Sequence, residues 1–368
     1  MKIVIDLTSL SYHMTGIERY AACVSEQMLR QDSINQYFLI FRNDVFPNFK
    51  KFINGKRVKA IILSGNSKLI FYQVILLRAL KKIKADKYLF FSYTSPIFFR
   101  KKGIINTVHD MGAWDYSDAM RVFQKIYWRT TIKCSAKNSE RIITVSNFSK
   151  ERIACILNFP KTKIDVIYSA VYDGICKENG ILFNEIKKIY DLPDKYIMTL
   201  STLEPLEPRK NMSLLLEAYS EIRDNVDYDL VLVGRKGWKM DEVIEKYNKE
   251  GRIHITGFVD DEHVSVIYKN ALCFVFPTLY EGFGLPPIEA LTQGVPVISS
   301  DAASMPEILR KQAVFFENNK KEQLIKLLIE LKDNVENMPK VLDEYQKEQY
   351  RFDVSAKKVL KIITQDIN

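Results

Sequence analysis

Residues 271–294 read ALCFVFPTLYEGFGLPPIEALTQG, and they decide the fold that we expect. The apolar run Ala271–Phe276 is typical of a fully buried strand, and Ile288–Gly294 is typical of a short helix that ends at a glycine. Between them lies a turn that contains Gly282 and Gly284. A strand, a glycine turn and a helix N-terminus together form an anion site, because unpaired backbone N–H groups and the helix dipole point toward the turn.

Two carboxylates, Glu281 and Glu289, flank this turn and stand eight positions apart. A site for phosphate alone has no use for acids beside it. Carboxylates accept hydrogen bonds from hydroxyl groups, so the pattern fits a ligand that carries both phosphate and hydroxyls. The stretch therefore indicates a nucleotide sugar.

The composition is that of a folded protein with two domains. A length of 368 residues exceeds one ordinary core and suits two domains of roughly 150 to 200 residues. A hydrophobic content of 47% with 27% charged residues excludes a disordered chain. No apolar run approaches the roughly 20 residues of a membrane span, and Met1–Asp6 reads as a buried strand rather than a signal peptide. The five cysteines are scattered without a C-x-x-C pair, so we expect reduced thiols in a cytosolic protein.

Positive charge is concentrated in the first half of the chain. The net charge is +9, from 54 Lys and Arg against 45 Asp and Glu. Three basic groups lie within residues 50–59, 78–87 and 100–102; apolar residues of 76–83 accompany the second group, and residues 98–99 precede the third. Basic residues beside apolar ones suit an anionic membrane surface, although each group alone also fits a solvated helix face. No motif for nucleic-acid binding is present.

Short apolar runs alternate with helical patterns in two series. The first series of expected strands is Lys2–Leu7, Tyr37–Phe41, Lys59–Leu63, Tyr88–Phe91, Ile104–His109 and Arg141–Val145. The second is Tyr196–Leu200, Tyr228–Val233, Arg252–Thr256, Leu272–Phe276 and Val295–Ser299. Helices are expected between strands, among them Gly16–Leu29, Ile70–Lys82, Val122–Asn138 and Asp261–Lys269. Strands that are apolar throughout and separated by helices predict parallel sheets covered on both faces.

The fold class is therefore α/β, with two facing, doubly wound, Rossmann-like domains. We expect a first domain over residues 1–171, a linker over 172–194, a second domain over 195–350 and a last helix within 351–368. The linker is expected because its residues are polar and weakly periodic. Ligands bind at the carboxyl ends of parallel strands, so the site should lie in the cleft between the domains.

Arg209 and Lys210 lie in the segment Ser201–Met212, which follows the first strand of the second domain. Two cations just before a helix are well placed to neutralise a pyrophosphate, although solvated loop charges explain the segment alone equally well. The two glutamates of the opening stretch belong to the same sheet edge, which favours the pyrophosphate site.

Three other strand ends carry candidate residues. Gly234 lets backbone approach a nucleotide, but a simple turn is the more frequent reading. His109, beside Asp110, fits a general base, a hydroxyl ligand or a core histidine. Gly16 opens a helix and lets backbone N–H groups approach a phosphate. Neither G-x-G-x-x-G nor a P-loop occurs, and residues 227–229, the one Asp-x-Asp triplet, read as a surface turn rather than a metal site.

These motifs, in this order, resemble the family-4 retaining glycosyltransferases of the GT-B fold, most of all bacterial mannosyltransferase-like enzymes of polysaccharide assembly. Glu281 and Glu289 meet the family's E-x7-E signature. The signature Leu-Glu-Pro-Arg-Lys-Asn is lengthened by three residues, because Leu203-Glu-Pro is followed by Leu206-Glu-Pro before Arg209. The resemblance extends from the Gly16 turn to the end of the second domain.

The resemblance implies a role for each candidate. The expected catalytic residues are His109, Glu281, Arg209 and Lys210. The expected donor-binding residues are Gly16, Ser201, Gly234, Val259, Gly282, Phe283, Gly284, Leu285 and Glu289. Glu289 would hold the ribose, Glu281 would lie at the donor sugar, and the backbone near Val259 would meet the base. The two cations would stabilise the departing diphosphate, so no metal is expected. Many members carry a second glycine where this chain has Glu18.

The resemblance also implies the reaction. Retention would proceed by front-face attack, with the leaving phosphate taking the acceptor's proton, so neither glutamate is an expected nucleophile. The first expectation is transfer of mannose from GDP-mannose to a polyprenyl-diphosphate-linked saccharide in O-antigen, capsule or exopolysaccharide synthesis. UDP- or dTDP-linked sugars, a same-fold epimerase or hydrolase, and an inactive glycosyltransferase-like scaffold are the alternatives. The expected location is cytoplasmic and peripheral on the inner membrane face, with Ser355–Thr364 as the helix that crosses back to the first domain.

Overall fold

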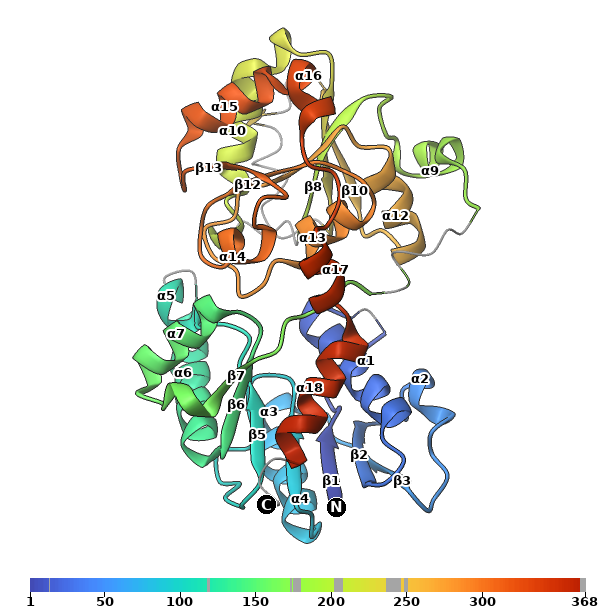
Figure 1. Cartoon of the computed structure of the whole chain (residues 1–368), viewed down its shortest axis with the longest axis vertical. Helices are drawn as coiled ribbons and strands as arrows, with labels where there is room; N and C mark the ends of the chain where they lie inside the picture. The colour runs from blue at the N-terminus through green and yellow to red at the C-terminus, as the bar shows by residue number, and fades with distance from the viewer. Residues whose placement is uncertain are drawn as a thin grey trace. The chain divides into compact units, whose positions relative to one another are not determined.

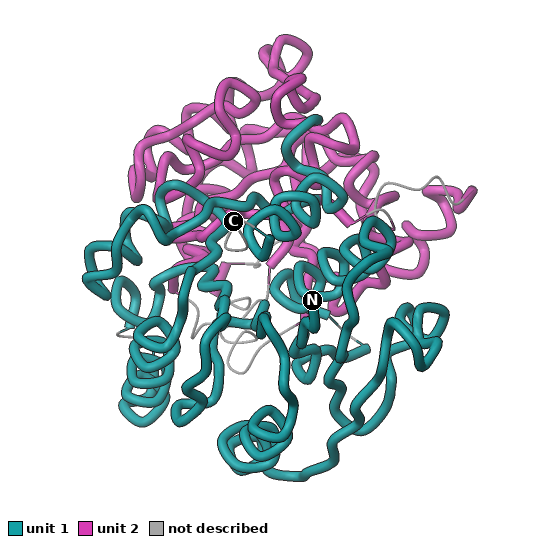
Figure 2. The backbone as a smooth tube through the Cα atoms, turned by 60° about the horizontal axis from the view of Figure 1, so that its bottom comes forward, with its two compact units in different colours: residues 1–170, 348–368 teal, residues 171–347 magenta. Residues whose placement is uncertain are grey.

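The computed structural model describes the whole chain except residues 13, 118–119, 173, 175–179, 202–207, 236–245, 248–250 and 365–368. The chain forms two compact units (Figure 2). The first unit contains Met1–Ala170 and Glu348–Asn368, and the second contains Val171–Lys347. Each unit is built on a parallel sheet with helices around it, as the α/β prediction required (Figure 1).

The sheet of the first unit has seven strands in the order β3-β2-β1-β4-β5-β6-β7. They are β1 Lys2–Asp6, β2 Gln36–Arg42, β3 Val58–Leu63, β4 Lys87–Phe90, β5 Ile104–Thr107, β6 Arg141–Thr144 and β7 Ile164–Val166. Every residue of β4 and β5 is buried, because these strands are covered on both faces. The order reverses between β1 and β4, where Asp6 pairs with Phe90 at the carboxyl ends. Such a reversal leaves a crevice above the sheet.

The described helical elements of the first unit are α1 Gly16–Gln31, α2 Pro47–Lys50, α3 Lys68–Ile70, η1 Phe71–Leu76, α4 Leu77–Lys82, α5 Gly112–Asp115, α6 Val122–Asn138, α7 Asn147–Leu157, η3 Lys161–Lys163 and α18 Phe352–Thr364. The expected helix Ile70–Lys82 is interrupted by a π-helical turn, η1. Leu76 and Leu80, two of the apolar residues that accompany the second basic group, are fully buried in the core against the sheet. These leucines therefore support the fold and do not face solvent.

The last helix, α18, belongs to the first unit and packs against α1. Figure 1 shows the two helices side by side, one at each end of the colour scale. The Ser355 hydroxyl donates a 2.8 Å hydrogen bond to the carbonyl of Tyr168, and the Gln31 amide donates one of the same length to the carbonyl of Asp353. Val359 and Ile363 are fully buried. The end of the chain thus completes a layer that the first residues begin.

The sheet of the second unit has six strands in the order β10-β9-β8-β11-β12-β13. They are β8 Tyr196–Leu200, β9 Asp229–Val233, β10 Ile253–Gly257, β11 Cys273–Phe276, β12 Val297–Ser300 and β13 Val314–Phe316. The described helical elements are α9 Phe183–Tyr190, η4 Pro208–Lys210, α10 Met212–Ile222, η5 Arg223–Asn225, α12 Asp261–Lys269, α13 Leu285–Thr292, α14 Met305–Leu309, α15 Lys321–Ile329, α16 Leu331–Asn334 and η6 Val335–Asn337. Here the order reverses between β8 and β11. Helix α17, Glu344–Gln349, contains the boundary between the units, after Lys347.

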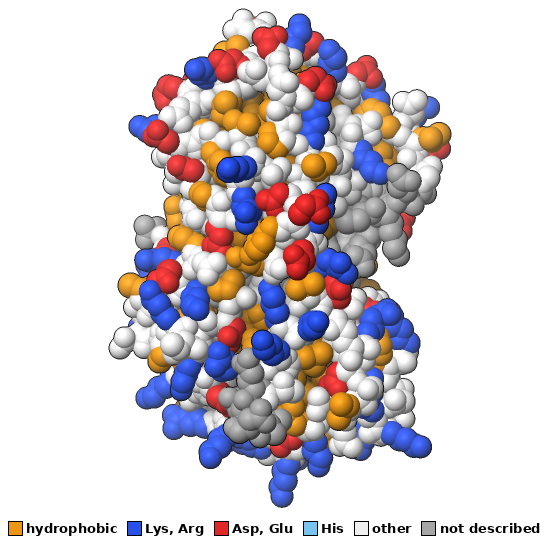
Figure 3. All heavy atoms as spheres, in the orientation of Figure 1, with side chains coloured by type: hydrophobic (Ala, Val, Ile, Leu, Met, Phe, Trp, Pro, Cys, Tyr) orange, Lys and Arg blue, Asp and Glu red, His pale blue; other side chains and the backbone are white. Residues whose placement is uncertain are grey.

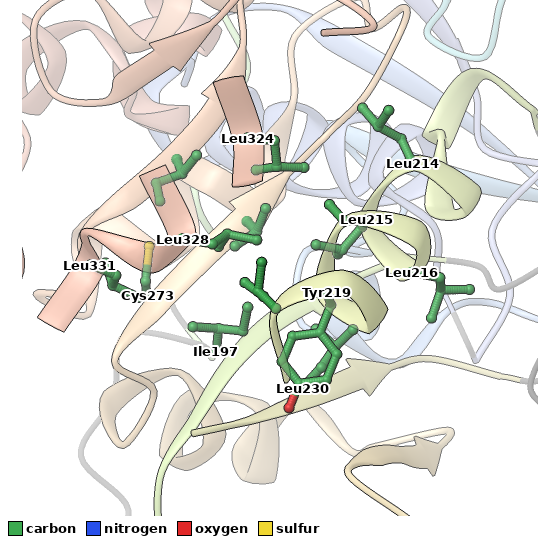
Figure 4. Close-up of a cluster of buried hydrophobic side chains, with 14 of the residues drawn as sticks. Ile197, Leu214, Leu215, Leu216, Tyr219, Leu230, Cys273, Leu324, Leu328 and Leu331 are labelled. Atoms are coloured by element: carbon green, nitrogen blue, oxygen red, sulfur yellow. The ribbon is translucent and has the colours of Figure 1, made fainter. Parts of the chain in front are cut away.

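One face of this sheet is covered by α10 and α15. Figure 4 shows Leu215 of α10, Leu328 of α15 and Cys273 of β11 in one buried apolar cluster. All three side chains are fully excluded from solvent. Apolar contacts of this kind fix the strands, so that the loops at their carboxyl ends have a rigid base.

Part of the stretch expected to be a linker, residues 172–194, is helical. Helix α9 packs against α12, and the Tyr190 hydroxyl lies 2.8 Å from Nδ1 of His263. These contacts attach the stretch to the second unit. Within the described part of the chain, no helix combines the length and apolar character that a membrane crossing needs.

Candidate active site

Three charged residues that the sequence singles out, Arg209, Lys210 and Glu281, lie in the two connections that flank the crevice between β8 and β11. Ser201 follows β8 directly, and Arg209 and Lys210 end the same connection in η4. Residues 277–284 connect β11 to α13. The lengthened motif itself, residues 202–207, lies outside the described residues. Because the connections leave neighbouring strands in opposite directions, their starting points flank one crevice.

Glu281 contacts both cations. Lys210 Nζ lies 2.5 Å from Glu281 Oε1, and the Arg209 guanidinium lies 3.5 Å from Oε2. The Arg209 carbonyl accepts hydrogen bonds from Leu279 N at 2.6 Å and Thr278 Oγ1 at 2.9 Å, which ties the two connections together. Two cations against one carboxylate leave an excess positive charge. That excess suits a phosphate-bearing ligand.

The turn after Glu281 depends on Gly284. This residue has φ +81° and stands before the first turn of α13. A Cβ atom at this position would lie 2.5 Å from Cε of Met305. The helix begins at Leu285, three residues before the sequence pattern predicts, so both prolines, residues 286–287, lie in its first turn. Proline has no N–H, and the first-turn donors therefore come from other residues.

Glu289 lies within α13 and is only 7% exposed. The Tyr268 hydroxyl of α12 lies 3.2 Å from Glu289 Oε2 and 3.2 Å from the carbonyl of Pro286. Tyr268 therefore anchors both the carboxylate and the start of the helix. Sequence reasoning did not identify Tyr268, because its contact with Glu289 connects two separate helices.

The other expected donor-binding residues lie along the same sheet edge. Ser201 N donates to the carbonyl of Val233 at 3.0 Å, which joins the ends of β8 and β9. Gly234 N donates to the carbonyl of Gly257 at 3.2 Å, which joins the ends of β9 and β10. Val259 follows β10 and is buried. The edge thus runs from Val259, through Gly234 and Ser201, to the Glu281 cluster.

His109 lies in the first unit, after β5, and is 7% exposed. Its Nε2 lies 2.8 Å from the carbonyl of Phe91. A carbonyl can only accept, so Nε2 carries the hydrogen and Nδ1 is the acceptor in the neutral ring. The rings of Tyr20 and Tyr93 meet the imidazole edge-on, with centroids 5.2 and 5.3 Å away. Burial lowers the pKa of His109, and the Phe91 carbonyl and Asp110 oppose that shift only in part.

Asp110 has a structural contact of its own. Its carboxylate accepts hydrogen bonds from the Tyr93 hydroxyl and from Gly112 N, each at 2.9 Å. Asp110 therefore fixes Tyr93, and Tyr93 packs against His109. Asp110 thus orients the His109 imidazole indirectly, through the Tyr93 ring.

Gly16 is the first residue of α1, as expected. Glu18 Oε2 accepts a 2.8 Å hydrogen bond from Thr15 N, so this carboxylate closes the first turn of the helix. A phosphate at Gly16 would meet that negative charge. Tyr20, one turn later, carries the contact from α1 to His109.

Comparison with known proteins identifies the chain. Residues 14–173 match the family model described as Glycosyltransferase Family 4, and residues 183–349 match that of Glycosyl transferases group 1. The chain belongs to the family-4 glycosyltransferases. It is therefore a hexosyltransferase, and its two units carry one family model each.

Relatives of this glycosyltransferase agree with that assignment. The chain is 27% identical to the O-antigen chain mannosyltransferase B of Escherichia coli over 328 residues, 84% of each chain. Sucrose-phosphate synthase of Thermosynechococcus elongatus has the same fold, with a TM-score of 0.74 and 16% identity over 99% of this chain and 98% of the other. HepE of Anabaena, solved in complex with UDP and glucose, has a TM-score of 0.72 and 13% identity over 99% of both chains.

Proposed function

We propose that this glycosyltransferase moves mannose from GDP-mannose to a growing, polyprenyl-diphosphate-linked saccharide in the synthesis of O-antigen, capsule or exopolysaccharide. The main support for a donor site at the β8–β11 crevice is the contact of Arg209 and Lys210 with Glu281. The choice of mannose is supported by the relative that is named as an O-antigen chain mannosyltransferase.

In this proposal, the donor binds along the edge from Val259 to Glu281. Glu289 accepts hydrogen bonds from the ribose, and Glu281 gives up part of its contact with the two cations, Arg209 and Lys210, when the diphosphate arrives. The bond between the anomeric carbon and the diphosphate breaks, a bond to the acceptor hydroxyl forms, and the hydroxyl proton passes to a phosphate oxygen. Positive charge held at the leaving group stabilises the transition state, so no metal ion is required.

His109 is assigned a binding role in this reaction. A neutral imidazole whose Nε2–H is held by the Phe91 carbonyl offers Nδ1 as an acceptor for a sugar hydroxyl. The leaving phosphate, rather than His109, takes the acceptor's proton. The base-side residues Gly234 and Val259 offer backbone rather than charged side chains, so UDP- and dTDP-linked sugars are the alternative donors.

We place the enzyme in the cytoplasm, against the inner membrane face that carries the acceptor. Arg78, Lys81, Lys82 and Lys84 are exposed and would face anionic headgroups. Figure 3 shows Lys and Arg side chains over the first unit, at the bottom of the view.

A panel of GDP-mannose, GDP-glucose, UDP-glucose and dTDP-glucose tests the donor. Binding to the native state raises the free energy of unfolding by RT ln(1 + [L]/Kd), about 2.7 kcal/mol at a hundred times Kd. We expect GDP-mannose to raise Tm most, and mannose transfer to a lipid-linked saccharide to continue in EDTA. Failure of all four sugars to raise Tm, together with no transfer, would overturn the proposed function.

A further inference from the structure

One segment, residues 300–305, supports the connection between β11 and α13 that contains the turn of the candidate active site. This segment runs from the end of β12 into α14. Near the start of the connection, Thr278 offers its backbone carbonyl to the Ser300 hydroxyl, which donates to it. At the end of the connection, Met305 lies against Gly284, since a Cβ added to this glycine would be 2.5 Å from Met305 Cε. The connection is therefore held at both ends by one neighbouring segment.

Ser304 supports the middle of the same connection. Its hydroxyl donates a 2.9 Å hydrogen bond to the backbone carbonyl of Glu281, and the serine is fully buried. The carboxylate of Glu281 meets Lys210 and Arg209, which belong to a different connection. The backbone and the side chain of Glu281 are thus fixed by two separate elements.

The position of Ser304 in the chain predicts a different role for its hydroxyl. A serine at the N-cap of a helix usually accepts a hydrogen bond from a backbone N–H of the first turn. Ser304 is the N-cap residue of α14, but its side chain makes no such bond. Within the described part of the chain, its side-chain hydrogen bond goes to Glu281 alone. This hydroxyl therefore serves the turn rather than its own helix.

The bond from Ser304 fixes the peptide unit that joins Glu281 to Gly282. In a trans peptide the C=O and the N–H point in opposite directions, so a carbonyl held by Ser304 turns the Gly282 N–H away from α14. Gly282 is buried, and no residue in the described part of the chain accepts from its N–H. Buried backbone donors nearly always have a partner. The Gly282 N–H is therefore a donor that a ligand can satisfy.

Helix α14 is a firm base for this contact. Its residues Met305, Ile308 and Leu309 are fully buried. At its far end, the Gln346 amide donates to the carbonyl of Ile308 at 2.7 Å and to that of Leu309 at 3.4 Å. Gln346 is itself fully buried, and its Oε1 accepts from Asp343 N at 2.9 Å. Contacts at both ends of so short a helix keep the hydroxyl at its start in place.

We propose that Ser304 is a positioning residue for the reaction, because it aims the Gly282 N–H at the β-phosphate of the donor. Glu281 is assigned to the donor sugar, so the next residue along the turn meets the phosphate that carries the sugar. Ser304 itself touches neither substrate and acts through the backbone of the turn. A donor that is oriented before the ligand arrives loses nothing to reorganisation when charge develops on the leaving group. This inference rests on the proposed function, which supplies the diphosphate, and it holds for any base or sugar.

Calorimetric titration with a nucleoside diphosphate and the matching monophosphate tests this role in the full-length protein. The base is the one that the panel of sugar nucleotides selects. The ratio of the two Kd values reports the β-phosphate alone, because the two probes share the base, the ribose and the α-phosphate. We expect the unmodified protein to bind the diphosphate at least about tenfold more tightly. In Ser304→Ala this advantage should fall by at least about threefold, because the Gly282 N–H loses its orientation.

Tyr219→Phe is the matched control, because it removes the same kind of bond from the same unit. The Tyr219 hydroxyl is fully buried and donates to the carbonyl of Tyr228, also at 2.9 Å. This bond lies in the apolar cluster of α10 and α15. The control should lose stability in urea as Ser304→Ala does and keep the full advantage for the diphosphate. An equal fall in Tyr219→Phe, or a fall of less than about threefold in Ser304→Ala, would overturn the role of Ser304.

The remaining outcomes separate this role from the proposed function. If the sugar nucleotide binds and transfer proceeds while the advantage is unchanged in Ser304→Ala, the proposed function stands and the positioning role fails. Equal Kd values for the two probes in the unmodified protein would show that the turn does not hold the β-phosphate, and would also overturn this role alone. If no nucleotide of the panel binds, the proposed function fails and the role of Ser304 fails with it.

Discussion

Glu281 accepts contacts from two cations that are separated from it by about seventy residues of chain. Sequence reasoning could place all three residues at carboxyl ends of strands, because strands that are apolar throughout are easy to recognise. It could not predict that the carboxylate would contact both cations, because that contact depends on how two loops pack. Tyr268 beside Glu289 and Tyr20 beside His109 were missed for the same reason.

Arg209→Ala and Lys210→Ala should each lower kcat/KM for transfer by about 10²–10³-fold. Each substitution removes a positive charge that would stabilise the leaving diphosphate. In other enzymes, removal of one group that stabilises transition-state charge lowers kcat by about this factor. Acceptor-dependent release of nucleoside diphosphate is the measurement. Lys195→Ala is the control, since Lys195 pairs with Asp227 on the surface and should retain full activity. Unchanged rates in both site variants would contradict the assignment.

His109 should make the free energy of unfolding depend on pH. Burial lowers its pKa in the folded state below the ordinary 6.5, so the unfolded state binds the proton first as the pH falls. Stability is therefore complete above about pH 6.5 and decreases below it. Urea unfolding at several pH values should show that His109→Gln has a shallower decrease than the parent between about pH 6.5 and 5. Identical pH profiles for the two proteins would rule this out.

Gly284→Ala should destabilise the second unit and weaken donor binding. A residue with a side chain at φ +81° costs roughly 1–2 kcal/mol, and the new Cβ would displace the Met305 methyl group. Gly294→Ala is a matched control, because Gly294 has φ +79° but a Cβ added there would meet open space, with nothing within 4 Å. Both variants should lose similar stability in urea, and Gly284→Ala alone should raise the Kd for GDP-mannose. Equal Kd values would show that the turn does not contact the donor.

At the scale of elements, the long strands and helices could be predicted and the short ones could not. Helices α6 and α12 have the bounds that the sequence pattern indicates. Strands β7 and β13 have three residues each, too few to show a pattern, and neither was expected. The π-helical turn η1 has the same apolar spacing as its neighbours and is equally invisible in the sequence.

The start of α1 gives a prediction at this scale. Glu18 closes the first turn by accepting from Thr15 N, so Glu18→Ala should lower the free energy of unfolding by about 1 kcal/mol. Glu18→Gln keeps an acceptor without the charge and should lose less than half of that. Chemical denaturation of the two variants provides the comparison. If Glu18→Gln instead loses more than half of the free energy of unfolding that Glu18→Ala loses, the charge, rather than the hydrogen bond, stabilises this helix end.

At the scale of the whole molecule, the first unit is built from both ends of the chain. Ile363→Ala should therefore destabilise the first unit by about 2–5 kcal/mol, because the side chain is fully buried and its removal leaves a cavity. Lys361→Ala changes an exposed position of the same helix and should stay within about 0.5 kcal/mol of the parent. Hydrogen exchange resolved by segment should show faster exchange in residues 1–170 of the Ile363 variant. Faster exchange confined to residues 171–347 would contradict it.

The return of α18 to α1 also sets an order of events during synthesis. The residues of the second unit, up to Lys347, are translated before α18. The first unit, although its residues emerge first, keeps an uncovered apolar face on α1 until the last helix is translated.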